Sequence, residues 1–476
     1  MKIKLCFFLL TLFGCMSKIK SPPNAIIKPH ELTLHGDTRV DNYYWMRLTD
    51  EQKKANQYDE QTQDVINYIA DENKYTKSSL SHTNKLQETL YDEIVSRIKK
   101  DDESVPYYKN GYYYYSRYEK NKEYRIHCRK KESLKSNEEI ILDENMLAKG
   151  YDYFAIGGRV ISPDNNWLAY GVDTVSRRIY DIYFKNLKTG EVLGQTISNS
   201  TGSVAWANDN KTVFYTSKNE TTLLGEKIWR HKVGEKLDDK LMYQEKDDTF
   251  YNGVYKSKSG KYIIIYHSST LISDYQILDA DNPNGQFKRF TARDFNHEYS
   301  IDHFNDKFYI VTNWIAENNR LMETSDKKTS ISNWKEVIPH RKDVHLLSIE
   351  IFTNHLVVSE RKNGLRELRI INQKNGEDSY IDFGEETYTS WLSVNEEFNT
   401  NILRYTYSSL VTPFSTYDYN MDTKQFDLKK RDEVIGGYDQ NKYTSERMYA
   451  TARDGKTIPI SLVYRKDKKI IKKDNF

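Results

Sequence analysis

Cysteines, glycines, prolines, long apolar runs and net charge are all scarce in this 476-residue chain. Three cysteines cannot build a disulfide framework, and 21 glycines with 9 prolines are too few for a collagen-like or low-complexity protein. The 71 basic and 69 acidic residues leave a formal charge of +2, spread along the whole chain. No nucleic-acid partner is therefore expected. Aromatic residues, at 13%, are plentiful and indicate a soluble globular protein with a sizeable core.

The longest apolar run, residues 5–13, follows Lys2 and Lys4 at the N-terminus. It is too short to span a bilayer, and a positive start, a short apolar run and a small residue are typical of a secretory signal. The segment ends in Leu-Phe-Gly-Cys, the pattern of a bacterial lipobox. We therefore predict a lipoprotein-type signal peptide over residues 1–15 and lipidation at Cys15. The expected location is the bacterial periplasm or cell envelope, with the lipid as the only membrane anchor; an ordinary export signal with an incidental cysteine is the alternative.

Two periodicities divide the remaining chain. Up to about residue 100, apolar and aromatic side chains recur at helical steps, which predicts an N-terminal helical arm over residues 16–100. These side chains are Tyr58, Val65, Ile69, Leu86, Leu90, Ile94 and Ile98. From residue 105 the period becomes two, with dense Tyr, Val, Ile and Phe, which indicates β-strands nearly to the end of the chain.

The β region contains seven similar units, each a polar turn followed by an alternating apolar strand. The units begin near Lys109, Ser162, Trp206, Ser257, Asn305, Phe352 and Asn395, at intervals of 43 to 53 residues. One four-stranded propeller blade occupies about 40 to 50 residues. We therefore predict a mainly β fold with a seven-bladed β-propeller over residues 101–435, in preference to an array of β-sandwiches.

The repeat stops near Gly436, and the chain continues as YTSERMYATARDGKTIPISLVYRKD (residues 443–467). Two alternating strands, residues 447–452 and 457–464, surround the turn at Asp454 and Gly455, which predicts a hairpin. Only a basic tail follows these strands, so that the sheet they need is not supplied by the residues after them.

Three segments resemble the prolyl oligopeptidase family, and most of all oligopeptidase B (protease II), which cuts short peptides after basic residues. They are DNYYWMRLTD (residues 41–50), SPDNNWLAYGVDTVSRRIYDIYFKNLKTG (residues 162–190) and the hairpin segment above. The resemblance implies that the propeller restricts access to a serine-protease active site. It also implies that residues 436–476 are the truncated start of an α/β-hydrolase domain. In the family, the catalytic Ser, Asp and His come after that hairpin.

Catalytic motifs are absent from the sequence itself. No glycine stands in a G-x-S-x-G elbow, and Gly194 and Gly202-Ser203 are the nearest failures. Glycine-lysine pairs at Gly260 and Gly455 lack the earlier glycines of a phosphate loop. We therefore expect no catalytic residue, no cofactor and no metal site.

Several other residues are ambiguous as functional candidates. His297 and His303 have no metal-ligand spacing and are expected in loops or at strand edges. The acidic run at residues 101–103 is expected to be a solvated connection, with substrate binding as the alternative. Cys128 is interpreted as a small buried hydrophobe. Arg177 and Arg178 face a central channel or flank a blade strand, and the sequence does not decide between the two.

Two functions follow from these interpretations. The first is the substrate-gating portion of an oligopeptidase B-like serine endopeptidase, inactive alone, with short peptides as ligands and a separate hydrolase-domain chain as a partner left open. The second is a membrane-tethered propeller that binds peptides or a partner protein without catalysis. A disrupted gene whose product folds poorly is the third reading.

Overall fold

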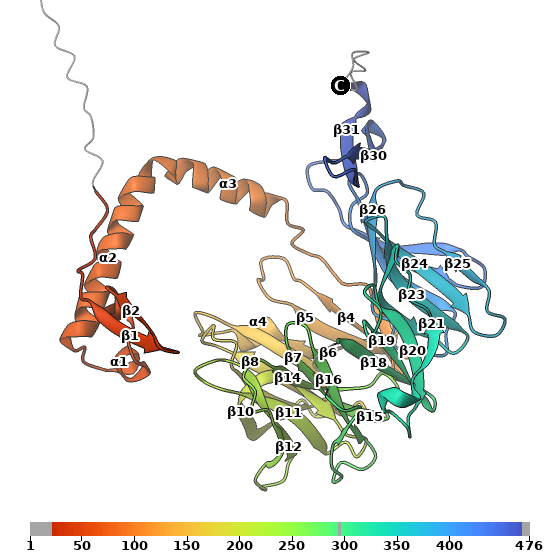
Figure 1. Ribbon diagram of the computed structural model, residues 1–476, viewed down its shortest axis with the longest axis horizontal. Coiled ribbons are helices and arrows are strands. Elements are labelled where there is room, and N and C mark those ends of the chain that lie inside the picture. The colour runs from red at the N-terminus through yellow and green to blue at the C-terminus, as the bar shows by residue number, and fades with distance from the viewer. Residues whose placement is uncertain (1–20, 294–296, 469–476) are drawn as a thin grey trace, which may run out of the picture. The chain divides into compact units, whose positions relative to one another are not determined.

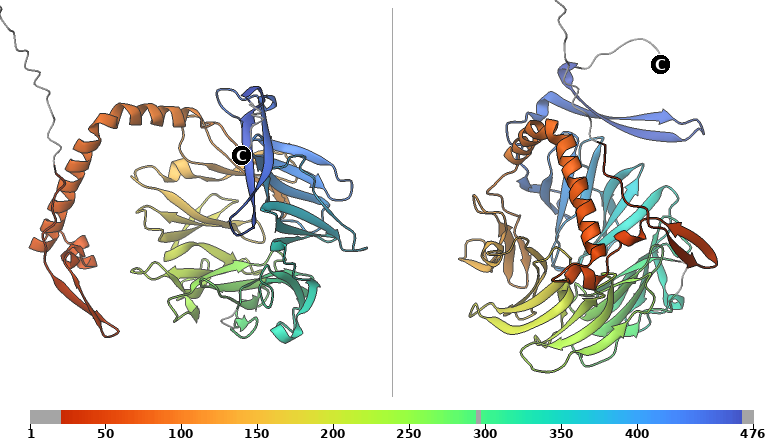
Figure 2. Two further views of the ribbon diagram at one scale, coloured as in Figure 1. Left: turned by 45° about the horizontal axis from the view of Figure 1, so that its top comes forward. Right: turned by 90° about the vertical axis from the view of Figure 1, so that its left-hand side faces the viewer.

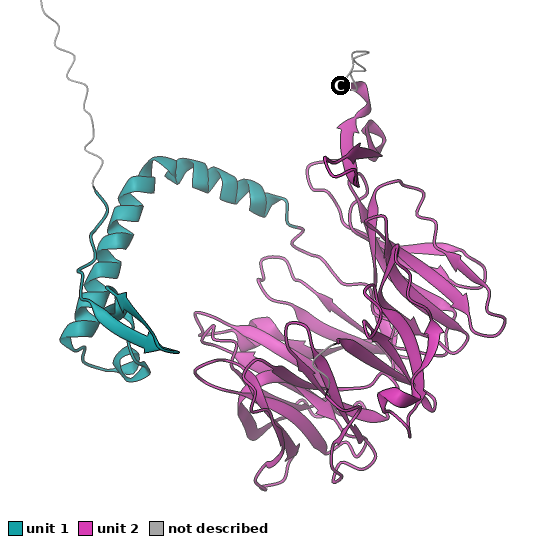
Figure 3. Ribbon diagram, viewed as in Figure 1, with its two compact units in different colours: residues 1–98 teal, residues 99–476 magenta. Residues whose placement is uncertain are grey.

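The computed structural model describes residues 21–293 and 297–468. Contacts divide the chain into two compact units, the first ending at Ile98 and the second beginning at Lys99 (Figure 3). No helix in the described ranges is long and apolar enough to cross a membrane.

The first unit combines a small hairpin with three helices. Its elements are β1 (His30–Leu34), β2 (Asp37–Asp41), α1 (Asp50–Lys54), α2 (Glu60–Leu80) and α3 (Asn84–Ser96). The Asp59 side chain caps α2 by accepting the Thr62 N–H at 2.7 Å. Thr49 and Gln52 form a reciprocal capping box on α1. The predicted helical arm over residues 16–100 is thus too large: the first regular element of the described part is a β-hairpin, and α-helices begin only at Asp50.

The second unit consists mainly of antiparallel sheets that follow one another around a common centre (Figures 1 and 2). Five sheets have four strands each. They are β3 (Tyr107–Lys109), β4 (Tyr112–Arg117), β5 (Ile126–Lys131), β6 (Glu138–Asp143); β14 (Tyr251–Lys256), β15 (Tyr262–Ser268), β16 (Ser273–Asp279), β17 (Lys288–Arg289); β18 (Tyr299–Phe304), β19 (Lys307–Thr312), β20 (Arg320–Ser325), β21 (Lys335–Ile338); β22 (Val344–Ile351), β23 (His355–Lys362), β24 (Leu365–Asn372), β25 (Asp378–Tyr380); and β26 (Tyr388–Leu392), β27 (Ile402–Ser409), β28 (Ser415–Asn420), β29 (Phe426–Arg431).

A sixth sheet has seven strands. They are β7 (Ala155–Ile161), β8 (Trp167–Asp173), β9 (Tyr180–Asn186), β10 (Val192–Trp206), β11 (Thr212–Lys218), β12 (Gly225–Lys232) and β13 (Lys240–Gln244). A short helix, α4 (Glu144–Leu147), precedes it, and the hairpin of β30 (Tyr443–Thr451) and β31 (Thr457–Arg465) follows the last propeller sheet.

The prediction of seven blades is wrong, because the structure has five four-stranded blades. The two repeats that begin near Ser162 and Trp206 are merged into the seven-stranded sheet. Its central strand β10 pairs with β9 and with β11, and Ser200 lies opposite Tyr180 on one side and Ser217 on the other. One strand therefore serves both repeats, which the spacing of sequence repeats cannot reveal.

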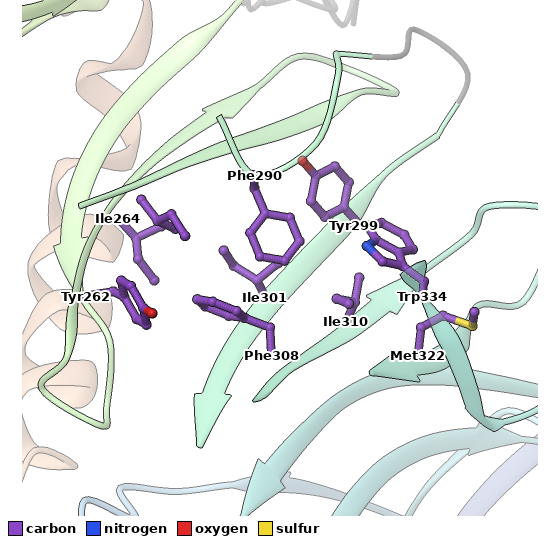
Figure 4. Close-up of a cluster of buried hydrophobic side chains, with 10 residues drawn as sticks. Tyr262, Ile264, Phe290, Tyr299, Ile301, Phe308, Ile310, Met322 and Trp334 are labelled. Atoms are coloured by element: carbon purple, nitrogen blue, oxygen red, sulfur yellow. The ribbon is translucent and has the colours of Figure 1, made fainter. Parts of the chain in front are cut away.

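The hydrophobic core lies between neighbouring sheets. Figure 4 shows one such cluster, to which the sheet β14–β17 contributes Tyr262 and the sheet β18–β21 contributes Phe308. Phe290 packs edge-on against Phe308, with ring centroids 5.0 Å apart, and Trp334 closes the cluster. Each sheet buries both faces against its neighbours, which is how a propeller obtains a core without helices.

Hydrogen bonds between turns define one face of this unit. The turns that join β3 to β4, β7 to β8, β10 to β11 and β14 to β15 contact one another in this order, and we call this side the turn face. Asn110 Nδ2 donates to the carbonyl of Pro163 at 2.7 Å, and the N–H of Asp164 donates to Asn210 Oδ1 at 2.9 Å. Asn208 Nδ2 continues the series to the Gly260 carbonyl at 3.2 Å.

The β30–β31 hairpin defines the opposite face, which we call the hairpin face. The Arg447 N–H donates to Glu386 Oε2 at 3.0 Å, and its guanidinium donates to the Asn363 carbonyl in the loop joining the second and third strands of one sheet. In antiparallel sheets these loops lie at the opposite ends of the strands from the first turns. Loops such as residues 174–179 and 219–224 therefore belong to the hairpin face.

Candidate functional site

Gly202 and Ser203, which come near to a G-x-S-x-G elbow in the sequence, serve the packing of strands. Gly202 has φ +88° within β10, and a Cβ there would lie 2.7 Å from the Tyr180 ring. Ser203 packs against Gly158, where an added Cβ would lie only 2.4 Å from Ser203 Oγ. Both positions thus hold strands in close approach. Gly194, by contrast, has open space around it.

Both nominated histidines are buried: His297 lies in the loop before β18, and His303 lies on β18, the first strand of its sheet. His303 Nδ1 lies 2.8 Å from Ser259 Oγ, and burial lowers its pKa to about 4. A neutral His303 therefore packs on Phe308, with ring centroids 4.9 Å apart. His297 stacks on Tyr299. In residues 21–293 and 297–468, no three His, Cys, Asp or Glu side chains gather as a metal site would require.

The remaining nominated residues have structural surroundings too, where the structure describes them. Asp102, in the acidic run before β3, pairs with Lys430 at 2.6 Å and so connects the first and last sheets. Cys128 is fully buried, and burial raises the pKa of its thiol to about 12. Cys15 lies outside the described residues.

The first strands of three sheets bring charged side chains together, which sequence reasoning missed. Lys258 Nζ lies 2.5 Å from Glu350 Oε1, and Lys109 Nζ lies 2.8 Å from Glu396 Oε2. Asp302 on β18 is exposed and forms no ion pair with any described residue. Protein surrounds it even so, and this desolvation raises its pKa to about 6 against the opposing effect of Lys258.

An unusual loop lies on the hairpin face between β8 and β9. Arg177 and Arg178 are both exposed there, and Lys218 Nζ at the end of β11 donates to the carbonyl of Arg178 at 2.5 Å. The structure thus places the two arginines at a blade-connecting loop. Their paired occurrence in the sequence was the available signal, but their alignment with Lys218 depends on the fold.

A cavity of about 580 Å³ lies between the sheets β18–β21 and β22–β25. Its charged lining is already paired, because Lys307 binds Glu323 at 3.0 Å and Arg369 binds Asp378. The walls also include Arg341, which is paired with Glu360, and the uncharged polar side chains of Asn372 and Gln373. This cavity therefore offers no free charge for recognising a ligand.

Apolar side chains are exposed on the hairpin and on the first unit. On β30 and β31 they are Met448, Tyr449, Ile458, Ile460, Leu462 and Val463, each between 37% and 56% exposed. On α3 and just after it they are Leu86, Leu90, Tyr91, Ile94 and Ile98. Contiguous exposed apolar surface of this kind marks a place where another protein surface packs.

Comparisons with known proteins agree with this architecture. Residues 23–432 match the family described as prolyl oligopeptidase, N-terminal beta-propeller domain. A dipeptidyl aminopeptidase BI from Pseudoxanthomonas mexicana is 39% identical over 94% of this chain and 63% of its own length. Protease 2 of Moraxella lacunata is 31% identical over 92% of this chain and 62% of its own.

A solved structure of oligopeptidase B from Leishmania major superimposes with a TM-score of 0.84 at 28% identity, covering 94% of this chain and 66% of that one. The chain thus spans less than two thirds of the length of the relatives it matches. The resemblance carried by residues 41–50, 162–190 and 443–467 is confirmed. This chain belongs to the prolyl oligopeptidase family and contains its N-terminal propeller domain.

Proposed function

We propose that this chain is the substrate-gating portion of an oligopeptidase B-like serine endopeptidase that acts on short peptides. Within the proposal, residues 16–100 form the arm, residues 101–435 the propeller, and residues 436–476 the start of an α/β-hydrolase domain. The observation that carries it is the β30–β31 hairpin, whose outward apolar side chains have no function in a propeller that works by itself.

The same surfaces support a catalytic domain as the covering partner. Met448, Ile460 and Leu462 expose 52%, 39% and 37% of their area. Taking such a side chain from full exposure to full burial is worth about 1.5 to 3 kcal/mol. Since more than half of this area is already covered on average, a domain that covers all three gains roughly 2 to 4 kcal/mol of association energy. The relatives of this chain extend well beyond the length it spans, which is consistent with such a domain.

We also propose export and lipid anchoring at Cys15, which places the propeller in the bacterial periplasm or cell envelope. The support is the sequence of residues 1–15 alone. Growth of an expressing strain with a radiolabelled fatty acid tests this, and the Cys15→Ala variant should lose the label. Label retained by that variant would remove the anchor from the proposal.

An arginyl reporter peptide tests the central proposal. These 476 residues contain no G-x-S-x-G elbow, so that by themselves they should release no reporter above background. Addition of a separately produced hydrolase domain from a relative should restore hydrolysis that a serine-directed inhibitor blocks. Inhibitor-sensitive turnover by the chain alone would contradict the proposal. Tight peptide binding without any hydrolysis in the mixture would favour the alternative of a propeller that binds without catalysis.

A further inference from the structure

The loop between β8 and β9 is held in one conformation by a buried carboxylate. Asp173 is only 2% exposed, and its Oδ1 accepts the N–H groups of Val175 at 2.8 Å and Ser176 at 3.0 Å. Its Oδ2 accepts the N–H of Arg178 at 2.7 Å. Three bonds from one side chain fix the path of the loop, although the loop itself is exposed to solvent.

Two residues of this loop adopt a backbone conformation that side chains disfavour. Ser176 has φ +64° and Arg178 has φ +55°. Left-handed conformations at residues other than glycine cost about 1 to 3 kcal/mol and persist where surrounding bonds enforce them. Here the Asp173 carboxylate supplies those bonds. The loop therefore holds the backbone of Arg177 and Arg178 in one conformation.

The positive charge at this position is not neutralised by ion pairs. Arg177, Arg178 and Lys218 form no ion pair within 4 Å of any carboxylate in the described parts of the chain, whereas Arg117, for example, pairs with Glu119 and Glu138. Burial and then the adjacent charge of Arg178 lower the pKa of Lys218. The nearby Asp173 directs its oxygens at loop N–H groups, so that two guanidinium groups remain available to solvent.

We propose that Arg177 and Arg178 form a binding site for the carboxylate of a short peptide, with Lys218 holding the loop beneath them. The inference rests on the proposed function, which brings peptides to the hairpin face. A guanidinium offers two parallel N–H groups that match the two oxygens of a carboxylate, and such pairs are among the stronger hydrogen bonds in proteins. A free α-carboxylate or an acidic side chain has the required chemistry.

The test compares two fluorescent tetrapeptides that differ only in a C-terminal carboxylate or carboxamide. Binding to the full chain is followed by fluorescence anisotropy at low and at physiological salt. We expect the carboxylate peptide to bind about tenfold more tightly, which corresponds to about 1.4 kcal/mol, with a smaller difference at the higher salt. The Arg177→Gln and Arg178→Gln variants should each reduce this preference, and the double variant should abolish it.

The Lys188→Gln variant is the matched control, since Lys188 is also exposed, belongs to a turn of the same sheet and forms no ion pair with described residues. Its preference should equal that of the unmodified chain. Equal binding of the two peptides would overturn this inference while leaving a peptide-binding propeller intact. A preference that survives in the double variant would overturn it as well. Absence of binding by either peptide also rejects it, and the reporter assay above decides the proposed function separately.

Discussion

The first and last sheets of the propeller meet without a shared strand, because β3–β6 and β26–β29 form separate sheets. Side chains make the connection. Arg404 on β27 donates through one terminal nitrogen to the Pro106 carbonyl at 2.6 Å, and through two other nitrogens to Asp418 at 2.7 and 2.9 Å. Lys109 pairs with Glu396 across the same boundary at 2.8 Å. Arg404 is thus expected to hold the two ends of the sheet series together.

Replacing Arg404 with Met keeps most of the aliphatic stem and removes all three of these hydrogen bonds. The lost bond to Pro106 is charge-assisted and worth about 1.5 to 3 kcal/mol. Asp418, whose side chain is 18% exposed, then loses its partner at a further cost of about 1 to 3 kcal/mol. We expect the free energy of unfolding to fall by about 3 kcal/mol. Adding Asp418→Asn to this variant should restore the stability lost because the Asp418 carboxylate has no partner. The stability lost with the hydrogen bond to Pro106 should not return.

Hydrogen exchange followed by mass spectrometry locates the effect. In Arg404→Met, the amides of β3 and β4 should exchange faster than in the unmodified chain, because the boundary opens more often. Arg320→Met is the matched control: the Arg320 side chain is also 15% exposed, but it pairs with Glu336 inside one sheet. It should leave exchange in β3 and β4 unchanged. Unaltered protection of these strands in Arg404→Met, or equal loss in the control, would refute the reasoning.

Three further changes test the packing and the charges. Gly171→Ala places a Cβ 2.4 Å from the Gly202 carbonyl oxygen and should destabilise the chain by about 1 to 3 kcal/mol in thermal unfolding, whereas Gly194→Ala meets no atom within 4 Å and should be close to neutral. Burial raises the pKa of Asp302 to about 6, so that its ionised form opposes folding above pH 6 and this cost disappears as the pH falls towards 4. Asp302→Asn should therefore stabilise the chain by about 1 kcal/mol at pH 8, after allowing for solvent screening, and should have no effect at pH 4. The Cys128 thiol, buried and with a raised pKa, should react with a thiol reagent only after unfolding in urea; equal rates in native protein would show that the site is open.

Periodicity predicted the class of structure but not how the sheets divide. Segments such as β15 and β23 were readable as strands, because they contain short runs of Tyr, Ile, Leu and Val that the sheets bury on both faces. A turn with positive φ at Gly455 was also readable, and a strand pair surrounds it in the structure. The merger of two repeats at Ser200 was not readable, because both partner strands pair with one residue whose neighbours look like an ordinary polar turn.

The candidate site was predictable only as a pair of arginines. Whether Arg177 and Arg178 flank a strand or form a loop depends on Asp173, whose carboxylate accepts three backbone N–H groups of the loop that joins the paired strands β8 and β9. Lys218 is distant in sequence and arrives through the pairing of β10 with β11. Asp302 gave no signal either, because its raised pKa comes from desolvation that exists only in the folded protein.

The two faces of the propeller unit differ in what their residues are already bonded to, and this difference decides where changes affect binding. On the turn face, the side-chain amides of Asn110, Asn208 and Asn210 form hydrogen bonds with neighbouring turns. Substitutions there remove hydrogen bonds inside the protein, so that stability should fall while affinity for a ligand stays unchanged.

On the hairpin face, the guanidinium groups of Arg177 and Arg178 are exposed and form no ion pair with described residues. Substitutions there remove charge that the fold does not use, so that affinity should fall while stability stays within about 0.5 kcal/mol. Measuring both quantities for Asn208→Ala and Arg178→Gln separates the two classes, and a large loss of stability in Arg178→Gln would mean that the loop serves the fold and not a ligand.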